Sequence, residues 1–218
     1  MGIEREIKLT LPPAQAKAAQ QWFTARTGAA GRPVMLDNLY FDTPELKLAR
    51  SKSALRLRRT PDGWLQTFKT VGQAQGGLHS RHEWEIPVAG PALEIDALQQ
   101  ACDDAEAAAA LRNAAPQLVE LFRTNFTRTL WHVVHDGTDI EAAIDQGEIV
   151  AQVNGETRRA PISEVELELK RGDDDAVLHA FAAELTASVP GLAPEDVSKA
   201  QRGYQLRESG TRTGTGTA

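Results

Sequence analysis

Residues 164–170 read Glu-Val-Glu-Leu-Glu-Leu-Lys, a strict alternation of charged and apolar side chains. Successive side chains of a β-strand point to opposite faces, so one face of a strand here carries only charged groups and the other only aliphatic ones. The charged set is Glu164, Glu166, Glu168 and Lys170. A sheet with one face in solvent alternates in the same way, so this stretch predicts a strand without showing where its charged face points.

The alternation returns in other segments of the chain. Residues 3–9, 54–58, 66–69 and 80–86 each place charged or polar side chains on one face and mostly apolar ones on the other. The charged sets are Glu4, Glu6 and Lys8, then Arg56 and Arg58, then Lys69, and then Arg81, Glu83 and Glu85. Faces exposed to solvent are usually richer in Ser, Thr and Gln. A closed barrel with a charged, wet interior and an apolar exterior under helices accounts for both faces.

The expected fold is therefore α+β with β dominant: a closed antiparallel β-barrel of about eight strands, with a charged lumen and flanking helices. The expected strands are residues 3–10, 34–42, 54–60, 63–71, 79–88, 122–135, 139–145, 147–153 and 162–171. The expected helices are residues 12–27, 93–113, 176–188 and 198–204, and the tryptophans Trp22, Trp64, Trp84 and Trp131 are expected to anchor helices to the barrel. Residues 1–206 form one domain, and residues 207–218 are expected to be a disordered tail or linker.

Composition narrows the setting of the protein. The chain has 218 residues, 41% of them hydrophobic and 25% charged, which is typical of a globular domain. It contains no apolar run of about 18 residues, so no membrane-spanning helix is expected. A net charge of −6 argues against nonspecific binding to nucleic acid. The lone cysteine, Cys102, cannot form a disulfide within the chain, which favours a cytoplasmic location.

A lumen that holds both cations and carboxylates suits a polyanion together with a divalent metal ion. The planar guanidinium of arginine donates two parallel hydrogen bonds to a phosphate, and lysine adds a compact charge. Glutamates supply the hard oxygen ligands that Mg²⁺ or Mn²⁺ prefers. The chain has no P-loop, so the expected phosphate site is the barrel itself.

Several segments, taken in order, resemble one known family. They are Glu4-x-Glu6-x-Lys8, LDNLYFDTP at 36–44, LRLRR at 55–59, TFK at 67–69, GGLHSRHEWE at 76–85, AAIDQGEI at 142–149, EVELELK at 164–170 and SKAQRGYQL at 198–206. The set is similar to the CYTH superfamily, the triphosphate tunnel metalloenzymes. Within it the chain is most similar to the bacterial inorganic triphosphatase branch, where segments like GGLH, DQGE and SKAxRGY occur together.

The resemblance implies a role for each matched residue. The metal-binding carboxylates implied are Glu4, Glu6, Glu166 and Glu168. The implied triphosphate-binding cations are Lys8, Arg56, Arg58, Lys69, Arg81, Arg128, Lys170 and Lys199. Glu4, Glu6, Lys8, Asp145 and Glu148 are the implied catalytic groups, and Glu83, Glu85 and Glu141 are further acids of the lumen. Asp145 and Glu148 remain alternatives, because Gln146 and Gly147 can form a turn or bulge that resets the alternation.

The implied function is metal-dependent hydrolysis of inorganic tripolyphosphate to diphosphate and phosphate, with Mg²⁺ or Mn²⁺ as cofactor. The alternatives are a class IV adenylate cyclase, a thiamine- or nucleoside-triphosphatase, and a noncatalytic module that binds polyphosphate, since one fold serves several chemistries. Many proteins of the bacterial branch carry a helical, histidine-rich CHAD domain after the CYTH domain. A C-terminal CHAD domain is therefore a candidate partner within a longer protein.

Overall fold

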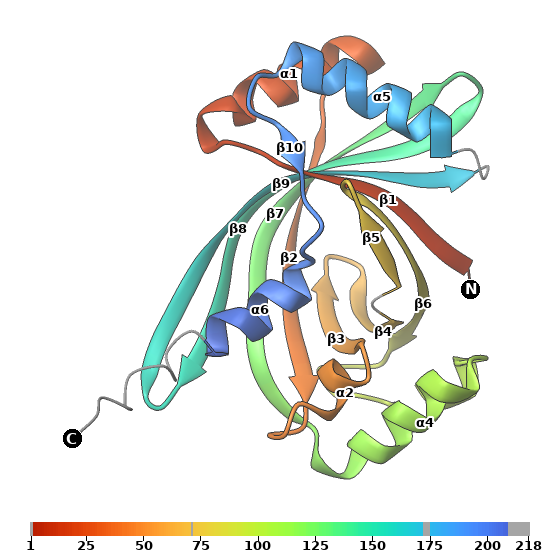
Figure 1. The fold of residues 1–218 in the computed structure, drawn as a ribbon, viewed down its shortest axis with the longest axis vertical. Helices are drawn as coiled ribbons and strands as arrows, with labels where there is room; N and C mark the ends of the chain where they lie inside the picture. The colour runs from red at the N-terminus through yellow and green to blue at the C-terminus, as the bar shows by residue number, and fades with distance from the viewer. Residues whose placement is uncertain (1, 71, 172–174, 209–218) are drawn as a thin grey trace.

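Eight antiparallel strands close into a barrel in the computed structural model, which describes residues 2–70, 72–171 and 175–208 (Figure 1). In order around the barrel the strands are β1 (Gly2–Thr10), β9 (Glu156–Arg171), β8 (Thr138–Val153), β7 (Val119–His135), β2 (Arg32–Asp42), β3 (Ser53–Thr60), β4 (Gly63–Thr70) and β6 (Leu78–Val88). Strand β6 pairs with β1 and closes the ring. Two short strands, β5 (Gln73–Gln75) and β10 (Ala193–Pro194), pair with β6 and β1. The predicted closed barrel is confirmed.

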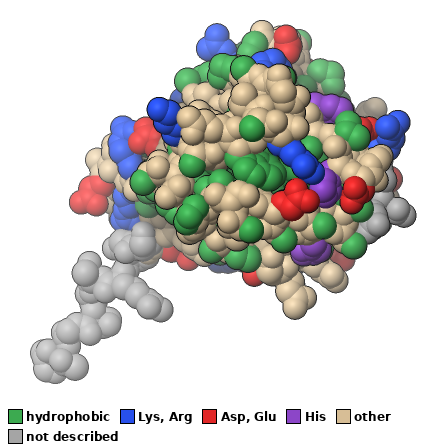
Figure 2. All heavy atoms as spheres, turned by 90° about the horizontal axis from the view of Figure 1, so that it is seen from above, with side chains coloured by type: hydrophobic (Ala, Val, Ile, Leu, Met, Phe, Trp, Pro, Cys, Tyr) green, Lys and Arg blue, Asp and Glu red, His purple; other side chains and the backbone are tan. Residues whose placement is uncertain are grey.

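Two helices cover one side of the barrel's outer surface. They are α1 (Ala16–Thr27), which follows the short 3-10 turn η1 (Pro13–Gln15), and α5 (Asp175–Ser188). Phe23 of α1 stacks on Trp131 of β7 at 5.0 Å between ring centroids, and Phe181 of α5 joins the same cluster. The apolar faces of β1, β8 and β9 supply the rest of this core. Figure 2 looks onto this helical layer, where hydrophobic side chains gather in the middle and charged ones lie mainly around them.

A second helical layer covers the strands on another side. It consists of α2 (Lys47–Arg50), α3 (Ile95–Ala101) and α4 (Ala105–Ala114), with the 3-10 turn η2 (Ala115–Gln117) after α4. Leu55, Phe68 and Trp84, on β3, β4 and β6, are at most 1% exposed beneath it. The apolar side chains of the alternating strands therefore point outward into helical layers, as the sequence predicts, and the charged ones point inward.

The last helix, α6 (Lys199–Glu208), contacts β7, β8 and β9 and crosses the barrel apart from both layers (Figure 1). Its Tyr204 packs edge-on against Phe122, which stacks on Tyr40 at 4.7 Å. Gly203 lets the helix approach closely, because a Cβ atom there would lie 2.1 Å from the Phe122 ring. None of the helices in the described residues combines the length and apolar character that a membrane crossing requires.

Some local predictions were wrong. Strand β8 runs unbroken from Thr138 to Val153, so Gly147 makes neither a turn nor a bulge. The helical segment expected at 93–113 is divided into two helices, because Asp104 caps the second by accepting a hydrogen bond from the Ala107 amide at 2.8 Å. Helix α6 continues through Glu208, two residues into the expected tail, and the tail residues 209–218 lie outside the described part of the chain.

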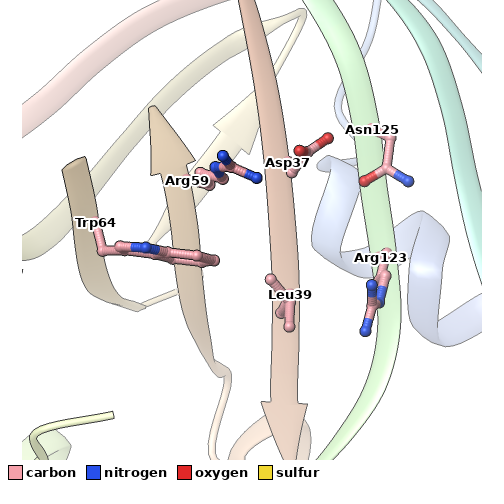
Figure 3. A pocket seen from close by; sticks show the side chains of 6 residues that line it. All are labelled: Asp37, Leu39, Arg59, Trp64, Arg123 and Asn125. Atoms are coloured by element: carbon pink, nitrogen blue, oxygen red, sulfur yellow. The ribbon is translucent and has the colours of Figure 1, made fainter. Parts of the chain in front are cut away.

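Three of the four tryptophans pack as predicted, but Trp64 does not. Trp22, Trp84 and Trp131 join the two helix-covered cores. Trp64 lines a shallow hollow of about 480 Å³ on the outer face of β2, β3, β4 and β7, beside Leu39 (Figure 3). The alternation correctly predicts that Trp64 points outward from the barrel. It does not predict which part of the outer surface a helix covers, because that depends on the connections between strands.

Candidate active site

The barrel encloses a cavity of about 850 Å³ whose walls are charged. Nearly all of the sequence-predicted site residues line it: Glu4, Glu6, Lys8, Arg56, Arg58, Lys69, Arg81, Arg128, Glu166, Glu168, Lys170 and Lys199, with the further acids Glu83, Glu85 and Glu141. They come from β1, β3, β4, β6, β7, β8, β9 and α6. Residues that are far apart in the sequence therefore meet because these strands each turn one or more charged side chains inward.

One group of charges joins β1, β4 and β6. Arg81 donates from Nε to Glu4 at 2.6 Å and from a terminal nitrogen to Glu6 at 2.7 Å. Lys69 Nζ lies 2.5 Å from Glu83 and 3.3 Å from Glu4. Burial opposes ionisation of Glu4, but Lys69 and Arg81 outweigh it and hold the pKa of Glu4 well below its usual range. Burial and the Glu4 carboxylate raise the pKa of Glu83, although Lys69 pulls it down.

A second group joins β7, β8, β9 and α6 at greater depth. Arg128 donates to both oxygens of Asp145, at 2.8 and 2.7 Å, and also to Glu166. Lys199 of α6 lies 2.6 Å from Asp145 and 2.8 Å from Glu166, and it donates to Glu164. Asp145 and Glu164 are at most 1% exposed. The five side chains form a closed network in which each charge has an opposite partner.

Electrostatics keeps this second group ionised. Burial disfavours the charged forms, yet Lys199 and Arg128 hold the pKa of Glu166 well below its usual range. Arg128 and Lys199 also lower the pKa of Asp145, although burial raises it. The carboxylates in turn raise the pKa of Lys199 and of Lys8, whose Nζ lies 3.2 Å from Glu166. Asp145, Glu166, Lys8 and Lys199 are therefore charged across the neutral range.

The remaining charges lie towards the wall formed by β2, β3 and β4 and at the rim. Arg56 donates to Thr67 at 3.0 Å and to Glu85 at 3.2 Å, and its buried Nε has no hydrogen-bond partner among the described residues. Arg58 donates from Nε to Asn38 at 2.7 Å. At the rim, Lys170 donates to Glu168 at 2.9 Å with 46% of its side chain exposed.

The regular pairing of β8 with β7 determines where the side chains of Asp145 and Glu148 lie. Asp145 lies opposite Arg128 and Glu148 opposite Asn125, three positions apart and therefore on opposite faces. Asp145 is fully buried, whereas Glu148 contacts Arg159 and its side chain is 40% exposed. The structure thus places Glu148 outside the lumen, and Asp145 lies just behind the cavity wall.

Sequence reasoning left Glu164 and Asn38 out of the predicted site, and it left Arg202 open between a place at the tunnel mouth and a role in helix packing. Glu164 shares the face of Glu166 in the alternating segment, so its inward position was visible from the pattern. Arg202 donates to Glu164 at 3.1 Å from α6, whose docking against the barrel has no local signature in the sequence. Asn38 is a neutral residue in a strand that carries few charges, and the pattern of charges gave no reason to select it.

The carboxylates of the lumen fit a hard divalent cation by their chemistry. Oxygen atoms of Asp145, Glu164 and Glu166 lie within 4.8 Å of one another, close enough to share one ion. Glu6 pairs with Glu168 across the β1–β9 ladder, which brings two members of the predicted metal set together. Lys199, Arg128 and Arg81 lie among these oxygens, so metal binding requires the cations to shift or to share them.

The lowered and raised pKa values predict how stability depends on pH without metal. The pKa values of Glu4, Asp145 and Glu166 are lowered on folding, so their stabilisation is complete above the ordinary values of 4.5 and 3.8 and is lost as the pH falls below them. The pKa values of Lys8 and Lys199 are raised above 10.5, so their stabilisation is lost as the pH rises past that value. We expect the free energy of unfolding to fall steeply below about pH 4 and again above about pH 10.5.

Urea unfolding in EDTA across this pH range measures the effect. Glu83 and Glu168 have raised pKa values and contribute in the opposite sense, but below their ordinary value of 4.5 they are protonated in both the folded and unfolded states. They therefore do not mask the loss in acid. A free energy of unfolding that rises between pH 4 and pH 2 would contradict the assignment of these networks.

The comparisons with known proteins agree with this geometry. A family model described as the CYTH domain matches residues 2–204. The chain is 32% identical over 206 residues to an inorganic triphosphatase of Haemophilus influenzae, a match that covers 93% of this chain and 54% of that protein. The chain thus spans about half the length of the curated relative it matches.

Solved structures show the same fold at low identity. An adenylyl cyclase candidate from Hippeastrum, described as having a dominant triphosphatase activity, has a TM-score of 0.65 at 19% identity, over 93% of this chain and 95% of that one. An adenylate cyclase candidate from Bacillus halodurans has a TM-score of 0.54 at 18% identity, over 93% and 98% of the two chains. With the family match over nearly the whole chain and the charged antiparallel barrel, this protein belongs to the CYTH domain family.

Proposed function

We propose that this chain is the catalytic domain of a metal-dependent triphosphatase that cleaves inorganic tripolyphosphate to diphosphate and phosphate. The observation that carries the proposal is a lumen of about 850 Å³ in which arginines, lysines and glutamates from separate strands converge. The name of the Haemophilus influenzae relative supports the choice of substrate. A lone cysteine in 218 residues supports a cytoplasmic setting.

The proposed substrate cradle is the set of lumen cations. Arg56 and Arg58 on β3 would contact one part of the triphosphate, while Lys69 on β4 and Arg81 on β6 would contact another part. The full set is Lys8, Arg56, Arg58, Lys69, Arg81, Arg128, Lys170 and Lys199. Phosphoryl transfer depends mainly on positioning and charge neutralisation, which a fixed set of guanidinium and ammonium groups supplies. Asp145 holds Arg128 by two hydrogen bonds and is therefore a positioning residue.

The proposed metal ligands are Glu4, Glu6, Glu166 and Glu168, with Mg²⁺ or Mn²⁺ as the ion. Such an ion, when bound, polarises a phosphoryl oxygen and lowers the pKa of water. Glu83, Glu85 and Glu141 are further lumen acids that would orient a water molecule or hold a second ion. Along β1, Lys8 follows Glu4 and Glu6 on the same face, so one strand would contact both the metal ion and the phosphate.

Substitution of Glu4 tests the proposed activity. We expect Glu4→Gln to lower metal-dependent release of phosphate from tripolyphosphate by about 100-fold, since an amide is a weaker ligand for a divalent ion and Arg81 loses a charged partner. The measurement is phosphate release from tripolyphosphate, ATP and thiamine triphosphate, each with Mg²⁺, Mn²⁺ or EDTA. Glu120→Gln is a matched control, because Glu120 lies outside the lumen and pairs with Arg123.

The same assay separates the alternative functions. Formation of cyclic AMP from ATP would identify a cyclase, and a preference for thiamine triphosphate or ATP would identify a different triphosphatase. Tight binding of tripolyphosphate without turnover of any substrate would mean that the lumen is a receptor. Equal turnover in wild type and Glu4→Gln would remove Glu4 from the metal site.

A further inference from the structure

Arg58 differs from the other cations of the lumen in its partners. Each of the other seven cradle cations has a carboxylate oxygen within 4.0 Å of its charged nitrogens. Among the described residues, no carboxylate lies that close to Arg58. Its charge is nevertheless inside the barrel, because Arg58 lines the cavity between Arg56 and the β2 wall. Within the described part of the chain, Arg58 is therefore a lumen guanidinium without a direct ion pair.

The partner of Arg58 is a neutral side chain. Asn38 lies beside Arg58 in the β2–β3 ladder and is fully buried. Its Oδ1 accepts the hydrogen bond from Arg58 Nε at 2.7 Å, and its Nδ2 donates to the Thr124 carbonyl on β7 at 2.9 Å. The bond to Thr124 settles which end of the amide faces Arg58, since only the nitrogen can donate to a carbonyl. Asn38 is thus fixed on one side by β7 and fixes Arg58 on the other.

A neutral acceptor has a specific consequence at this position. An aspartate would orient Arg58 equally well, but it would also neutralise the guanidinium and compete with an anionic ligand. Asparagine occupies only Nε and leaves the two terminal nitrogens for another acceptor. Those two nitrogens form the planar fork that donates two parallel hydrogen bonds to one phosphate group.

We propose that Asn38 is a positioning residue, which holds Arg58 so that its two terminal nitrogens receive one phosphate group of the substrate. The inference rests on the proposed function, because the substrate is taken to be a linear triphosphate. Burial, together with the charges of Arg56 and Arg128, lowers the pKa of Arg58 to about 10, although Glu85 and Tyr40 act in the opposite direction. A bound phosphate supplies the missing negative charge.

A purely structural role for Asn38 is the competing explanation, because its bond to Thr124 also joins β2 to β7. The two roles differ in how Asn38 and Arg58 combine. If Asn38 acts through Arg58, its replacement has little further effect on substrate affinity once Arg58 is gone. If Asn38 only stabilises the sheet, its effect is the same with and without Arg58, so the two changes add.

A double-mutant cycle with Asn38→Leu and Arg58→Gln tests this inference. We expect Asn38→Leu to raise KM for tripolyphosphate about 10-fold, since a misdirected charged hydrogen bond costs about that much, with kcat changed far less. In the Arg58→Gln background the same change should alter KM less than about twofold. Additive effects on KM would overturn the inference.

Matched controls lie on the outer face of the same strands. Asn125, the neighbour of Thr124 on β7, points outward beside Asp37, and Arg59 points outward next to Arg58 (Figure 3). We expect Asn125→Leu to leave KM unchanged. In an Arg59→Gln background, Asn38→Leu should keep its full effect, because Arg59 does not face the lumen.

Two further readouts separate this inference from the proposed function. Calorimetry measures the Kd of tripolyphosphate for the same four variants, so the double-mutant cycle does not depend on turnover. Binding without turnover would refute the proposed triphosphatase activity and still test the role of Asn38. If the wild type binds no tripolyphosphate, both proposals fail. Nitrogen-15 NMR follows exchange of the Arg58 Nε hydrogen, which should be slow in wild type and fast in Asn38→Leu; unchanged exchange would overturn the inference.

Asn38→Asp serves if the leucine variant does not fold. The carboxylate keeps an acceptor for Arg58 Nε, so exchange of the Nε hydrogen should stay slow. It also supplies a negative charge, so tripolyphosphate should bind about 10-fold more weakly, as expected for loss of a charge-assisted hydrogen bond. Binding equal to that of wild type would mean that the uncompensated charge of Arg58 does not receive phosphate.

Discussion

Replacing Lys199 with methionine is expected to lower the free energy of unfolding by about 3–5 kcal/mol in the absence of metal, the range found when one partner of a buried ion pair is removed. Lys199 contacts Asp145, Glu164 and Glu166, whose oxygens lie within 4.8 Å of one another. Methionine retains most of the volume of the side chain, so the loss of charge dominates the effect.

The loss of Lys199 affects the three carboxylates differently, because each keeps different cations nearby. Arg128 still holds Asp145 and Glu166 in the variant, and Lys8 remains 3.2 Å from Glu166. Glu164 keeps Arg202 at 3.1 Å and Lys8 at 3.6 Å. Repulsion among three buried carboxylates with fewer cations favours the uptake of a proton or of a metal ion. We therefore expect the variant to gain more stability from a divalent cation than the wild type does.

Urea unfolding in EDTA, and then with Mg²⁺ or Mn²⁺, measures both effects. Lys170→Met is the matched control, because Lys170 is 46% exposed at the rim and its ion pair within the described residues is with Glu168. We expect less than about 1 kcal/mol from that change. Two results would show that Lys199 does not neutralise Asp145, Glu164 and Glu166. One is a decrease in the free energy of unfolding of less than about 1 kcal/mol for Lys199→Met, and the other is an equal stabilisation by metal in the variant and the wild type.

The alternation of charged and apolar residues predicted the barrel because every strand face is set by a period of two. Glu4, Arg56 and Glu166 could be placed in the lumen because several strands share the charged alternation, which one strand alone could not settle. Gly147 was misread since glycine marks bulges as well as close approaches; here a Cβ would lie 2.1 Å from the Asn125 carbonyl oxygen, so it marks a close approach of β7.

Features that depend on contacts between distant elements could not be read from the sequence. Lys199 reaches Asp145, Glu164 and Glu166 only because α6 crosses the barrel. The sequence of residues 198–206 does not predict where that helix packs. The resemblance to a family suggested that Lys199 binds triphosphate, whereas physical reasoning from the residues did not. Asn38 donates to a backbone carbonyl of β7 and accepts a hydrogen bond from Arg58. Neither hydrogen bond can be recognised from the pattern of charges in the sequence.

The docking of α6 is also the subject of the second large effect. We expect Gly203→Ala to destabilise the protein by about 1–3 kcal/mol through overpacking, although alanine favours a helix over glycine by about 1 kcal/mol. The added Cβ would lie 2.1 Å from the Phe122 ring. That ring cannot easily move, because Phe122 is 2% exposed between Tyr40 and Tyr204.

The strain should reach the site through the helix itself. If α6 moves away from β7 and β8, it carries Lys199 away from Asp145 and breaks the bond that Tyr204 donates to Asp42 at 3.2 Å. We expect turnover of tripolyphosphate to fall by about 100-fold, the size of effect that a shift of about 1 Å can produce. Gly203 itself makes no contact with substrate in this proposal, so the loss would come from position alone.

Thermal unfolding and tripolyphosphate turnover of Gly203→Ala measure the two effects, and Gly90→Ala is the control, because a Cβ at Gly90 meets no atom within 4 Å. The decisive test repeats the change in a Phe122→Ala background. There the ring is absent, the clash disappears, and Gly203→Ala should stabilise the protein by up to about 1 kcal/mol through helix propensity. If Gly203→Ala destabilises equally in both backgrounds, the close approach of α6 to Phe122 is not what seats this helix on the barrel.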